Sequence, residues 1–395
     1  MYDRRAALTF LREHLDVTSE AGDGLVQVQH RFRLSTVEVA TLLLEAHRSD
    51  PKRPKPKAGS ILQRLYDSKS ADSIPYAEPV PFEPDPAAPR LDGIGTVTLG
   101  KRRIPRLGVG CMRLVSHGGY VDGEVVTAIG LPLSPEANRH ALLNAVQGSG
   151  VRMLDLARGY GPWPGFGEGM LCDWFPLPRR GLMLASKVGY RRTVSATWAV
   201  DLDPKFLRAE LTASRQVFGA AVPLMYLVVR STPTTPVVHR PKQLARALAP
   251  LVEAQREGEI ELLGVANVTA DELEVLREAG PIAAVQNRFT LGALRNAPQR
   301  AVFDRCAELG LPFVTWGIFG EGVQPRPEAA PVVVEAAEEL GVTAEELTLA
   351  TLLAAGAHVV PLPGPGRRAS LDSCLRGAAL RLPAAMRQRL LGALM

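Results

Sequence analysis

The sequence predicts a (β/α)8 barrel preceded by a small α+β extension. From about residue 94 onward, short apolar runs alternate with amphipathic helical segments, and eight such strand–helix units fit in the remaining length. A hairpin pattern, GTVTLGKRRIPRLG with its turn at Gly100-Lys101, precedes the first unit. No GxGxxG motif follows the first strand, which argues against a doubly wound sheet, the alternative that periodicity alone leaves open.

Composition places the chain among folded globular proteins. It has 395 residues, of which 46% are hydrophobic and 22% charged, and its formal net charge is +5. No apolar run reaches the ~18 residues of a membrane-spanning helix, and the start, MYDRRAALTFLREHL, lacks a secretory core. We therefore expect a cytoplasmic protein with no membrane partner. The basic residues are spread along the chain without a nucleic-acid-binding motif, so no nucleic-acid partner is expected. The four cysteines and seven histidines show no ligand spacing, so no metal site is predicted, and the oligomeric state is left open.

Residues 1–90 are expected to form a separate extension, and residues 91–395 the barrel. Helical patterns over Asp3–Leu15 and over Ser35–His47, the second opened by a capping box, flank an alternating strand pattern over Leu25–Leu34. The proline-rich run PYAEPVPFEPDPAAPR is typical of an extended linker. The basic run PKRPKPK is either a solvated tether or a patch that docks an anionic partner. The extension as a whole is either a docking element or a lid over the barrel mouth.

Eight apolar runs are the candidate barrel strands. They are Leu107–Met112, Met153–Ala157, Leu182–Val188, Leu224–Val229, Leu262–Asn267, Ala283–Asn287, Phe313–Trp316 and His358–Pro363. The helices expected between them include Pro135–Gly148, Pro204–Phe218, Lys242–Glu257, Ala270–Ala279, Gln299–Leu309 and Ala344–Ala354. The long connection Val115–Pro132 contains a second hairpin pattern, GGYVDGEVV, and is an insertion expected near the pocket mouth.

Polar residues interrupt two successive apolar strands near their carboxyl ends. Asp155 lies in the second strand, Lys187 in the third, and Tyr160 follows Asp155 in the next loop. In a barrel of this type those strand ends face the active site. A buried carboxylate needs a cationic or hydrogen-bonding partner, which Lys187 supplies, and a nearby ammonium lowers a phenol pKa so that tyrosine can act as a general acid. A structural ion pair beside a packed tyrosine explains the same residues.

Together these segments resemble the aldo/keto reductase family. The likeness begins with DLARGYG from Asp155 and ASKVG from Ala185. It continues through EGEIELLGVANVTADEL from Glu257 and VQN from Val285, and ends with VVPLPG from Val359. The resemblance covers residues 94–382 in unbroken order. It implies a TIM barrel that binds NADPH in extended form, without a Rossmann fold, and reduces carbonyl compounds to alcohols.

The resemblance assigns catalytic roles to three of these residues. Tyr160 would donate a proton, Lys187 would lower the pKa of the tyrosine, and Asp155 would keep Lys187 charged. The family's fourth catalytic residue is a histidine at the end of the fourth strand, where this sequence has Arg230. A guanidinium there could polarise a carbonyl, hold an acidic substrate or pair with Asp155. We expect Arg230 to stabilise charge on the carbonyl oxygen and to favour carboxylate-bearing substrates. His239, beyond a Pro/Thr-rich loop, is not expected to replace the histidine.

The resemblance also implies a set of cofactor-binding residues. They are Gly110, Cys111 and Met112 beneath the nicotinamide ribose, Asn267 and Gln286 at the carboxamide, Trp316 stacked on the nicotinamide, Gly317, Ile318, Phe319 and Gly320 at the pyrophosphate, and Gly364, Arg367 and Arg368 at the adenosine 2′-phosphate. Two arginines suit a phosphate dianion better than the free hydroxyl of NAD, which predicts a preference for NADPH. Ala266 and Cys374 stand where the family usually has a serine and an asparagine. An alternative therefore stays open, in which the two arginines belong to a basic surface loop above a barrel that no longer binds cofactor.

The leading prediction is an NADPH-dependent oxidoreductase that reduces an aldehyde or ketone, its small-molecule carbonyl substrate, to an alcohol. Two alternatives remain open: a redox-neutral enzyme of the same fold, performing a dehydration or cyclisation, and a non-catalytic nucleotide-binding regulatory barrel. Near the pocket, Trp163 either walls the substrate site or packs its own loop. Cys111 has the position of a reactive thiol and the surroundings of an inert packing residue.

Overall fold

The computed structural model describes residues 89–91, 93–115, 119–121, 124–126, 136–161, 164–177, 181–192, 198–320 and 331–394, together with Thr9 and Leu42. The helices, strand and linker expected within residues 1–90 therefore lie almost wholly outside the described residues. Trp163 and most of the Val115–Pro132 connection lie outside them too, although the expected hairpin in that connection is present as β4 (Gly119–Val121) and β5 (Glu124–Val126).

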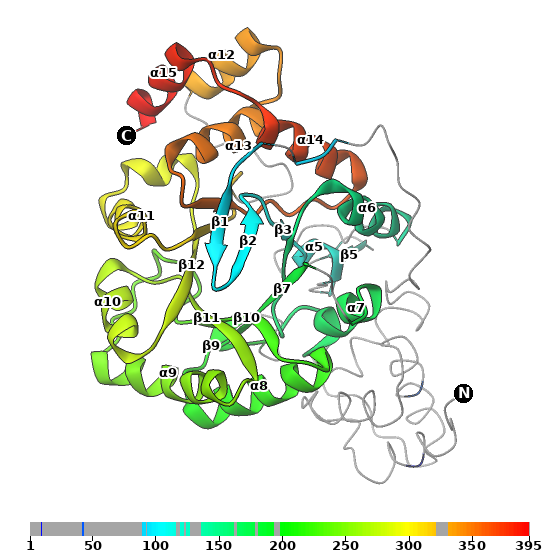
Figure 1. Cartoon of the computed structure of the whole chain (residues 1–395), viewed down its shortest axis with the longest axis vertical. Helices are drawn as coiled ribbons and strands as arrows, with labels where there is room; N and C mark the ends of the chain where they lie inside the picture. Colours follow the sequence, from blue (N-terminus) through cyan, green and yellow to red (C-terminus); the bar gives the residue numbers. More distant parts are fainter. Residues whose placement is uncertain are drawn as a thin grey trace.

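A short hairpin lies across one end of the barrel, in the centre of the view of Figure 1. It consists of β1 (Thr96–Leu99) and β2 (Arg102–Pro105), and its turn falls at Gly100-Lys101 as predicted. Gly100 has a φ of 58°, a conformation that favours glycine. Alternate residues of the hairpin, Val97, Leu99 and Ile104, join the apolar cluster inside the barrel. The hairpin therefore closes the amino-terminal end of the strands.

Eight parallel strands form the barrel, which confirms the predicted fold class. In chain order they are β3 (Val109–Gly110), β6 (Met153–Asp155), β7 (Met183–Val188), β10 (Val222–Val228), β11 (Ile260–Ala266), β12 (Ile282–Arg288), β13 (Phe313–Trp316) and β14 (Val359–Pro361). Each pairs with the next. The ring is closed where Gly108 N donates to Pro361 O at 3.0 Å and Gly110 N to Pro363 O at 2.8 Å.

Helices surround the strands, as Figure 1 shows. They are α5 (Met112–Val115), α6 (Glu136–Ser149), α7 (Phe166–Trp174), α8 (Pro204–Phe218), α9 (Pro241–Arg256), α10 (Ala270–Ala279), α11 (Ala297–Leu309), α12 (Pro331–Leu340), α13 (Ala344–Ala355), α14 (Arg368–Ala379) and α15 (Ala384–Leu394), with a 3-10 turn, η2 (Leu291–Arg295). Within the described residues, no helix is long and apolar enough to cross a membrane.

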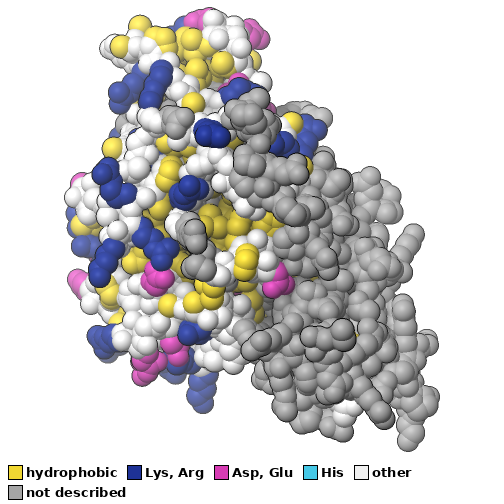
Figure 2. Space-filling model, turned by 45° about the vertical axis from the view of Figure 1, so that its right-hand side comes forward, with side chains coloured by type: hydrophobic (Ala, Val, Ile, Leu, Met, Phe, Trp, Pro, Cys, Tyr) yellow, Lys and Arg dark blue, Asp and Glu magenta, His cyan; other side chains and the backbone are white. Residues whose placement is uncertain are grey.

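Side chains alternate along the strands between two apolar clusters. In β10, Leu224, Tyr226 and Val228 face the barrel interior, whereas Met225 and Leu227 join the larger cluster between strands and helices. This alternation decides which polar side chains reach the barrel mouth. On the surface, Figure 2 shows Lys and Arg side chains scattered among acidic and neutral ones.

Candidate active site

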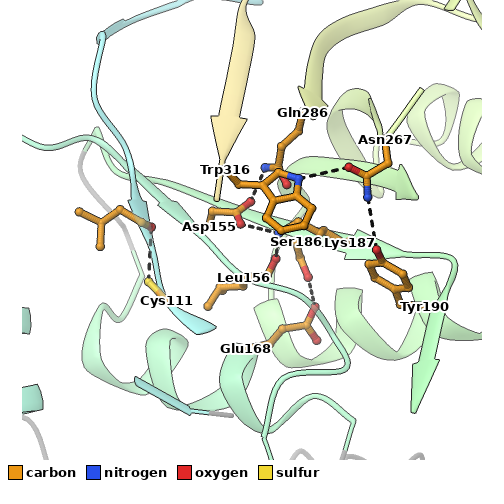
Figure 3. A network of polar contacts seen from close by, with 11 residues as sticks. Cys111, Asp155, Leu156, Glu168, Ser186, Lys187, Tyr190, Asn267, Gln286 and Trp316 are labelled. Atoms are coloured by element: carbon orange, nitrogen blue, oxygen red, sulfur yellow. Dashed lines mark hydrogen bonds and ion pairs between the residues drawn. The ribbon is translucent and has the colours of Figure 1, made fainter. Parts of the chain in front are cut away.

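A buried ion pair lies at the carboxyl ends of two adjacent strands, as the sequence predicted. Asp155 ends β6, and Lys187 lies near the end of β7. The Lys187 ammonium donates to Asp155 Oδ2, and also to the carbonyl of Leu156 at 2.5 Å (Figure 3). Burial raises the pKa of the Asp155 carboxyl and lowers that of Lys187, and their mutual attraction opposes both shifts.

Tyr160 is held beside this pair by its own loop. Its amide donates to Ala157 O at 2.9 Å, and its carbonyl accepts from Gly167 N of α7 at 3.1 Å. Lys187 Nζ lies 5.4 Å from the centre of the tyrosine ring. Burial first, and then the Asp155 carboxylate, raise the pKa of the Tyr160 phenol well above its usual value. Burial thus outweighs any lowering of this pKa by Lys187, and the expected effect of Lys187 on the phenol stays a prediction.

The two predicted carboxamide-binding amides take part in one network around the pair (Figure 3). Gln286 Nε2 donates to Asp155 Oδ1 at 2.7 Å. Asn267, which has a left-handed φ of 58°, directly follows β11 and donates to the carbonyls of Arg230 and Ser231 at 2.9 Å each. Its side-chain oxygen accepts from Trp316 Nε1 at 3.2 Å. The structure thus brings Asn267, Gln286 and Trp316 together at the mouth.

Tyr190 is a member of this network that sequence reasoning missed. It begins β8 (Tyr190–Arg192), which pairs with β9 (Trp198–Val200) in a hairpin directly after the Lys187 strand. Its hydroxyl donates to Ser231 O at 2.8 Å and accepts from Asn267 Nδ2 at 3.3 Å. An aromatic residue three positions after Lys187 was the available signal, but only the hairpin turns it toward Asn267.

Arg230 does not pair with Asp155, contrary to one of the expected alternatives. Its guanidinium forms a buried ion pair with Glu272, in the first turn of α10, and donates to Thr235 O at 3.3 Å. Glu272 also accepts from Thr269 N at 3.0 Å as part of the capping box of α10. Glu272 therefore balances the positive charge of Arg230. The expected preference for anionic substrates depended on that charge being free.

The expected phosphate loop contains two arginines in different states. Arg368 donates to both carboxylate oxygens of Asp372, at 2.8 and 3.0 Å, so its charge is neutralised. Arg367 caps the start of α14 and reaches Ser370 Oγ at 3.3 Å. Arg367 and Arg368 were both expected to hold a phosphate, and the pairing of Arg368 with Asp372 leaves Arg367 as the more available of the two.

Arg113 is a third arginine at this loop, and sequence reasoning missed it. It lies in α5, one residue beyond Met112, and a Cβ atom on Gly366 would lie 3.2 Å from its Cζ. Its Nε is buried and makes no hydrogen bond within the described part of the chain. Burial and the nearby Arg367 charge lower the pKa of Arg113. A buried cationic N–H without a hydrogen-bond partner, next to a second cation, is suited to bind an anionic group such as a cofactor phosphate.

The other predicted cofactor residues lie at the same end of the barrel. Gly110, Cys111 and Met112 form the turn from β3 into α5, where Cys111 N donates to Asp155 O at 2.9 Å and burial raises the pKa of the Cys111 thiol. Gly317, Ile318, Phe319 and Gly320 follow β13, with positive φ angles of 63° at Gly317 and 89° at Gly320. Gly364 follows β14, next to the β3 turn.

Comparison with known proteins identifies the family to which this chain belongs. The sequence profile of the aldo/keto reductase family matches residues 106–393, and the chain belongs to that family. An uncharacterized oxidoreductase of Schizosaccharomyces pombe is 26% identical over 291 residues, which cover 73% of this chain and 86% of that protein. Pyridoxine 4-dehydrogenase of Escherichia coli is 24% identical over 292 residues, covering 73% of this chain and 94% of the relative.

Solved structures share the fold at low identity. The glycerol dehydrogenase of Gluconobacter oxydans superposes with a TM-score of 0.60 and 14% identity, covering 76% of this chain and 95% of the other. An aldo-keto reductase from Klebsiella pneumoniae, solved in complex with NADPH, gives a TM-score of 0.56 and 16% identity over the same shares of the two chains. These structures, all below a quarter identical, establish the (β/α)8 architecture.

Proposed function

We propose that this protein is an NADPH-dependent oxidoreductase that reduces a carbonyl compound to an alcohol. The observation that carries the proposal is the convergence of Tyr160 with the buried Asp155–Lys187 pair, next to the amides of Asn267 and Gln286. A family relative of known fold has been solved with NADPH, which supports the choice of cofactor. The raised pKa of Tyr160 keeps its phenol protonated at neutral pH, the form that donates a proton.

The residues present fit the cofactor. Asn267 and Gln286 would hold the carboxamide, Trp316 would stack on the ring, and Arg113 with Arg367 would hold phosphate. When bound, the cofactor supplies a hydride to the carbonyl carbon. Tyr160 would donate its hydroxyl proton to the carbonyl oxygen. Lys187, kept charged by Asp155, would stabilise the phenolate that remains.

Cofactor titration followed by turnover tests the proposal. Quenching of tryptophan fluorescence gives the affinities for NADPH and NADH at one salt concentration, and loss of NADPH absorbance with a panel of aldehydes and ketones gives turnover. We expect tighter binding of NADPH and oxidation of it by at least one carbonyl class. Binding without oxidation would favour the regulatory barrel, and no binding would favour redox-neutral chemistry.

The arginines provide a matched pair of variants for the same titration. Arg113→Met removes the cation whose Nε lacks a partner, and we expect it to weaken NADPH binding by about tenfold, typical of one charge-assisted hydrogen bond. Arg368→Met removes a cation already bonded to Asp372, and NADPH binding should change little. Equal losses in the two variants would contradict the assignment of Arg113 to the phosphate site.

A further inference from the structure

The end of the fourth barrel strand lacks the polar side chain that the family resemblance leads one to expect there. Val228 faces the barrel interior, and Val229 packs among the helices. The Arg230 guanidinium is bonded to Glu272. His239 in the following loop places its Nε2 2.8 Å from the carbonyl of Val229. None of these four residues bonds to the Asp155–Lys187 pair, which leaves the question of which side chain of the fourth strand faces it.

Tyr226 is placed to do so. It lies in β10 with its Cα paired in register to that of Lys187 on β7, and both side chains face the barrel interior. Apart from Tyr226, every fully buried member of the interior cluster is aliphatic or a methionine. The Tyr226 hydroxyl is buried and makes no hydrogen bond of good geometry within the described residues. Its polar neighbours are Gln286, whose side chain interacts with the hydroxyl and lowers its pKa, and Asp155, whose charge adds to the dominant effect of burial in raising that pKa.

The barrel makes room for this ring. A Cβ atom on Gly264 of β11 would lie 2.4 and 2.5 Å from two carbons of the Tyr226 ring, far inside contact distance. The neighbouring interior positions Ala266 and Ala284 are also small. The ring therefore crosses β11 in the direction of β12, the strand that carries Gln286. Burying a hydroxyl that forms no well-aligned hydrogen bond is unfavourable, so phenylalanine would be the better residue if only packing mattered.

Asp155 would need another hydrogen-bond donor if Gln286 turned away from it. Its Oδ2 is occupied by Lys187, and its Oδ1 by the amide of Gln286 at 2.7 Å. The proposed function also requires that amide for the cofactor carboxamide. If Gln286 turns to the cofactor, Asp155 Oδ1 loses its donor in a buried site, where an unsatisfied carboxylate is costly.

We propose that Tyr226 is a positioning residue whose hydroxyl donates to Asp155 Oδ1 when the cofactor engages Gln286. In this way Tyr226 keeps Asp155 ionised and Lys187 charged beneath Tyr160. This proposal rests on the proposed function, because binding of the cofactor is the event that would move Gln286. It concerns the chain's own hydrogen bond, which can be observed without turnover.

Kinetics of Tyr226→Phe provide the first test, because the variant keeps the ring and removes the hydroxyl. We expect kcat to fall about tenfold, the effect of one hydrogen bond to a charged group, with little change in substrate KM or NADPH affinity. The pH profile of kcat should also shift, since the charge state of the pair changes. Unchanged kcat and pH profile in Tyr226→Phe would overturn the proposal.

Thr348→Val is the matched control. Thr348 on α13 carries another buried hydroxyl without a hydrogen bond in the described part of the chain, remote from the pair. Its removal should leave kcat and the pH profile unchanged. A fall in kcat equal to that of Tyr226→Phe would show a general response to deleting buried hydroxyls, and would also overturn the proposal.

Nuclear magnetic resonance separates this proposal from the proposed function. In protein labelled with [ζ-13C]tyrosine, the Tyr226 signal is the one absent from Tyr226→Phe. We expect it to shift in Gln286→Leu, where the hydroxyl becomes the donor to Asp155, and on addition of NADP+ to the unmodified protein. A wild type that reduces no carbonyl defeats the proposed function alone, whereas an unmoved Tyr226 signal in Gln286→Leu defeats this inference alone.

Discussion

Arg158 anchors the loop that carries Tyr160, and its removal should destabilise the protein in a pH-dependent way. Its side chain is fully buried, with Nε 3.1 Å from Glu210 Oε1 and Nη1 3.7 Å from Glu168 Oε2. Ser186 and Ser214 donate to the other Glu168 oxygen at 2.5 and 2.8 Å. This cluster joins the Tyr160 loop to α7, α8 and the strand of Lys187.

Arg158→Met replaces the guanidinium by an apolar chain of similar reach. It leaves the fully buried carboxyl of Glu168 and the largely buried one of Glu210 without the cation that lies between them. Breaking a buried ion pair in this manner costs about 3–5 kcal/mol. We therefore expect the free energy of unfolding to fall by about 3–5 kcal/mol near neutral pH.

The size of the loss should depend on pH, with a sign set by Glu168. Burial already raises the pKa of this carboxyl, and loss of the Arg158 charge, which lowers it, must raise it further. A carboxyl whose pKa is higher in the folded than in the unfolded protein contributes stability at low pH that is lost as pH rises. Each proton retained by the folded state recovers about 1.4 kcal/mol per pH unit, so about two units of acidification should recover up to ~2.8 kcal/mol.

Urea unfolding of wild type and Arg158→Met at several pH values between about 5.5 and 7.5 measures this. Arg305→Met, at a solvent-exposed pair with Glu274, is the control and should leave the free energy of unfolding nearly unchanged at any pH. The double variant Arg158→Met/Glu168→Gln should recover part of the loss at neutral pH. A loss in Arg158→Met that is below 1 kcal/mol, or that does not change with pH, would refute the reasoning.

Three further perturbations test other parts of the molecule. Tyr160→Phe should lower turnover by roughly 10²–10⁴-fold with cofactor affinity unchanged, and full activity in that variant would assign the proton to another group. Gly264→Ala should cost about 1–3 kcal/mol through the clash with the Tyr226 ring, and adding Tyr226→Leu should relieve part of it in thermal unfolding; strict additivity of the two would disprove the clash. Burial lowers the pKa of His358 from its usual 6.5, so its stability contribution is present above that pH and lost below it. His358→Gln should therefore flatten the decline of unfolding free energy between about pH 6.5 and 5, and an unchanged slope would exclude this histidine as its source.

The eight strands could be predicted from the sequence because each is a short, mainly apolar run that is buried over most of its length. Asp155 and Lys187 stood out for the same reason, as charges inside such runs. The pattern failed where a strand is short or irregular: β3 has only two residues, and Met112 of the predicted strand instead begins α5. Helix α7 was not predicted because its first residues, FGEG, are rich in glycine, and tertiary packing overrides that low propensity.

The sequence by itself determined the barrel, its closing hairpin and the strand ends at which Asp155 and Lys187 meet, since these follow from local periodicity and from the order of parallel strands. Only the tertiary structure decided what the charges and hydroxyls face. Glu272 is 42 residues from Arg230, and Gln286 is 131 residues from Asp155. No local pattern encodes such pairings, because they depend on the register between strands and on how each helix packs against the barrel. The neutralised charge of Arg230, the Arg113 Nε without a hydrogen bond in the described residues and the buried Tyr226 hydroxyl are consequences of that packing.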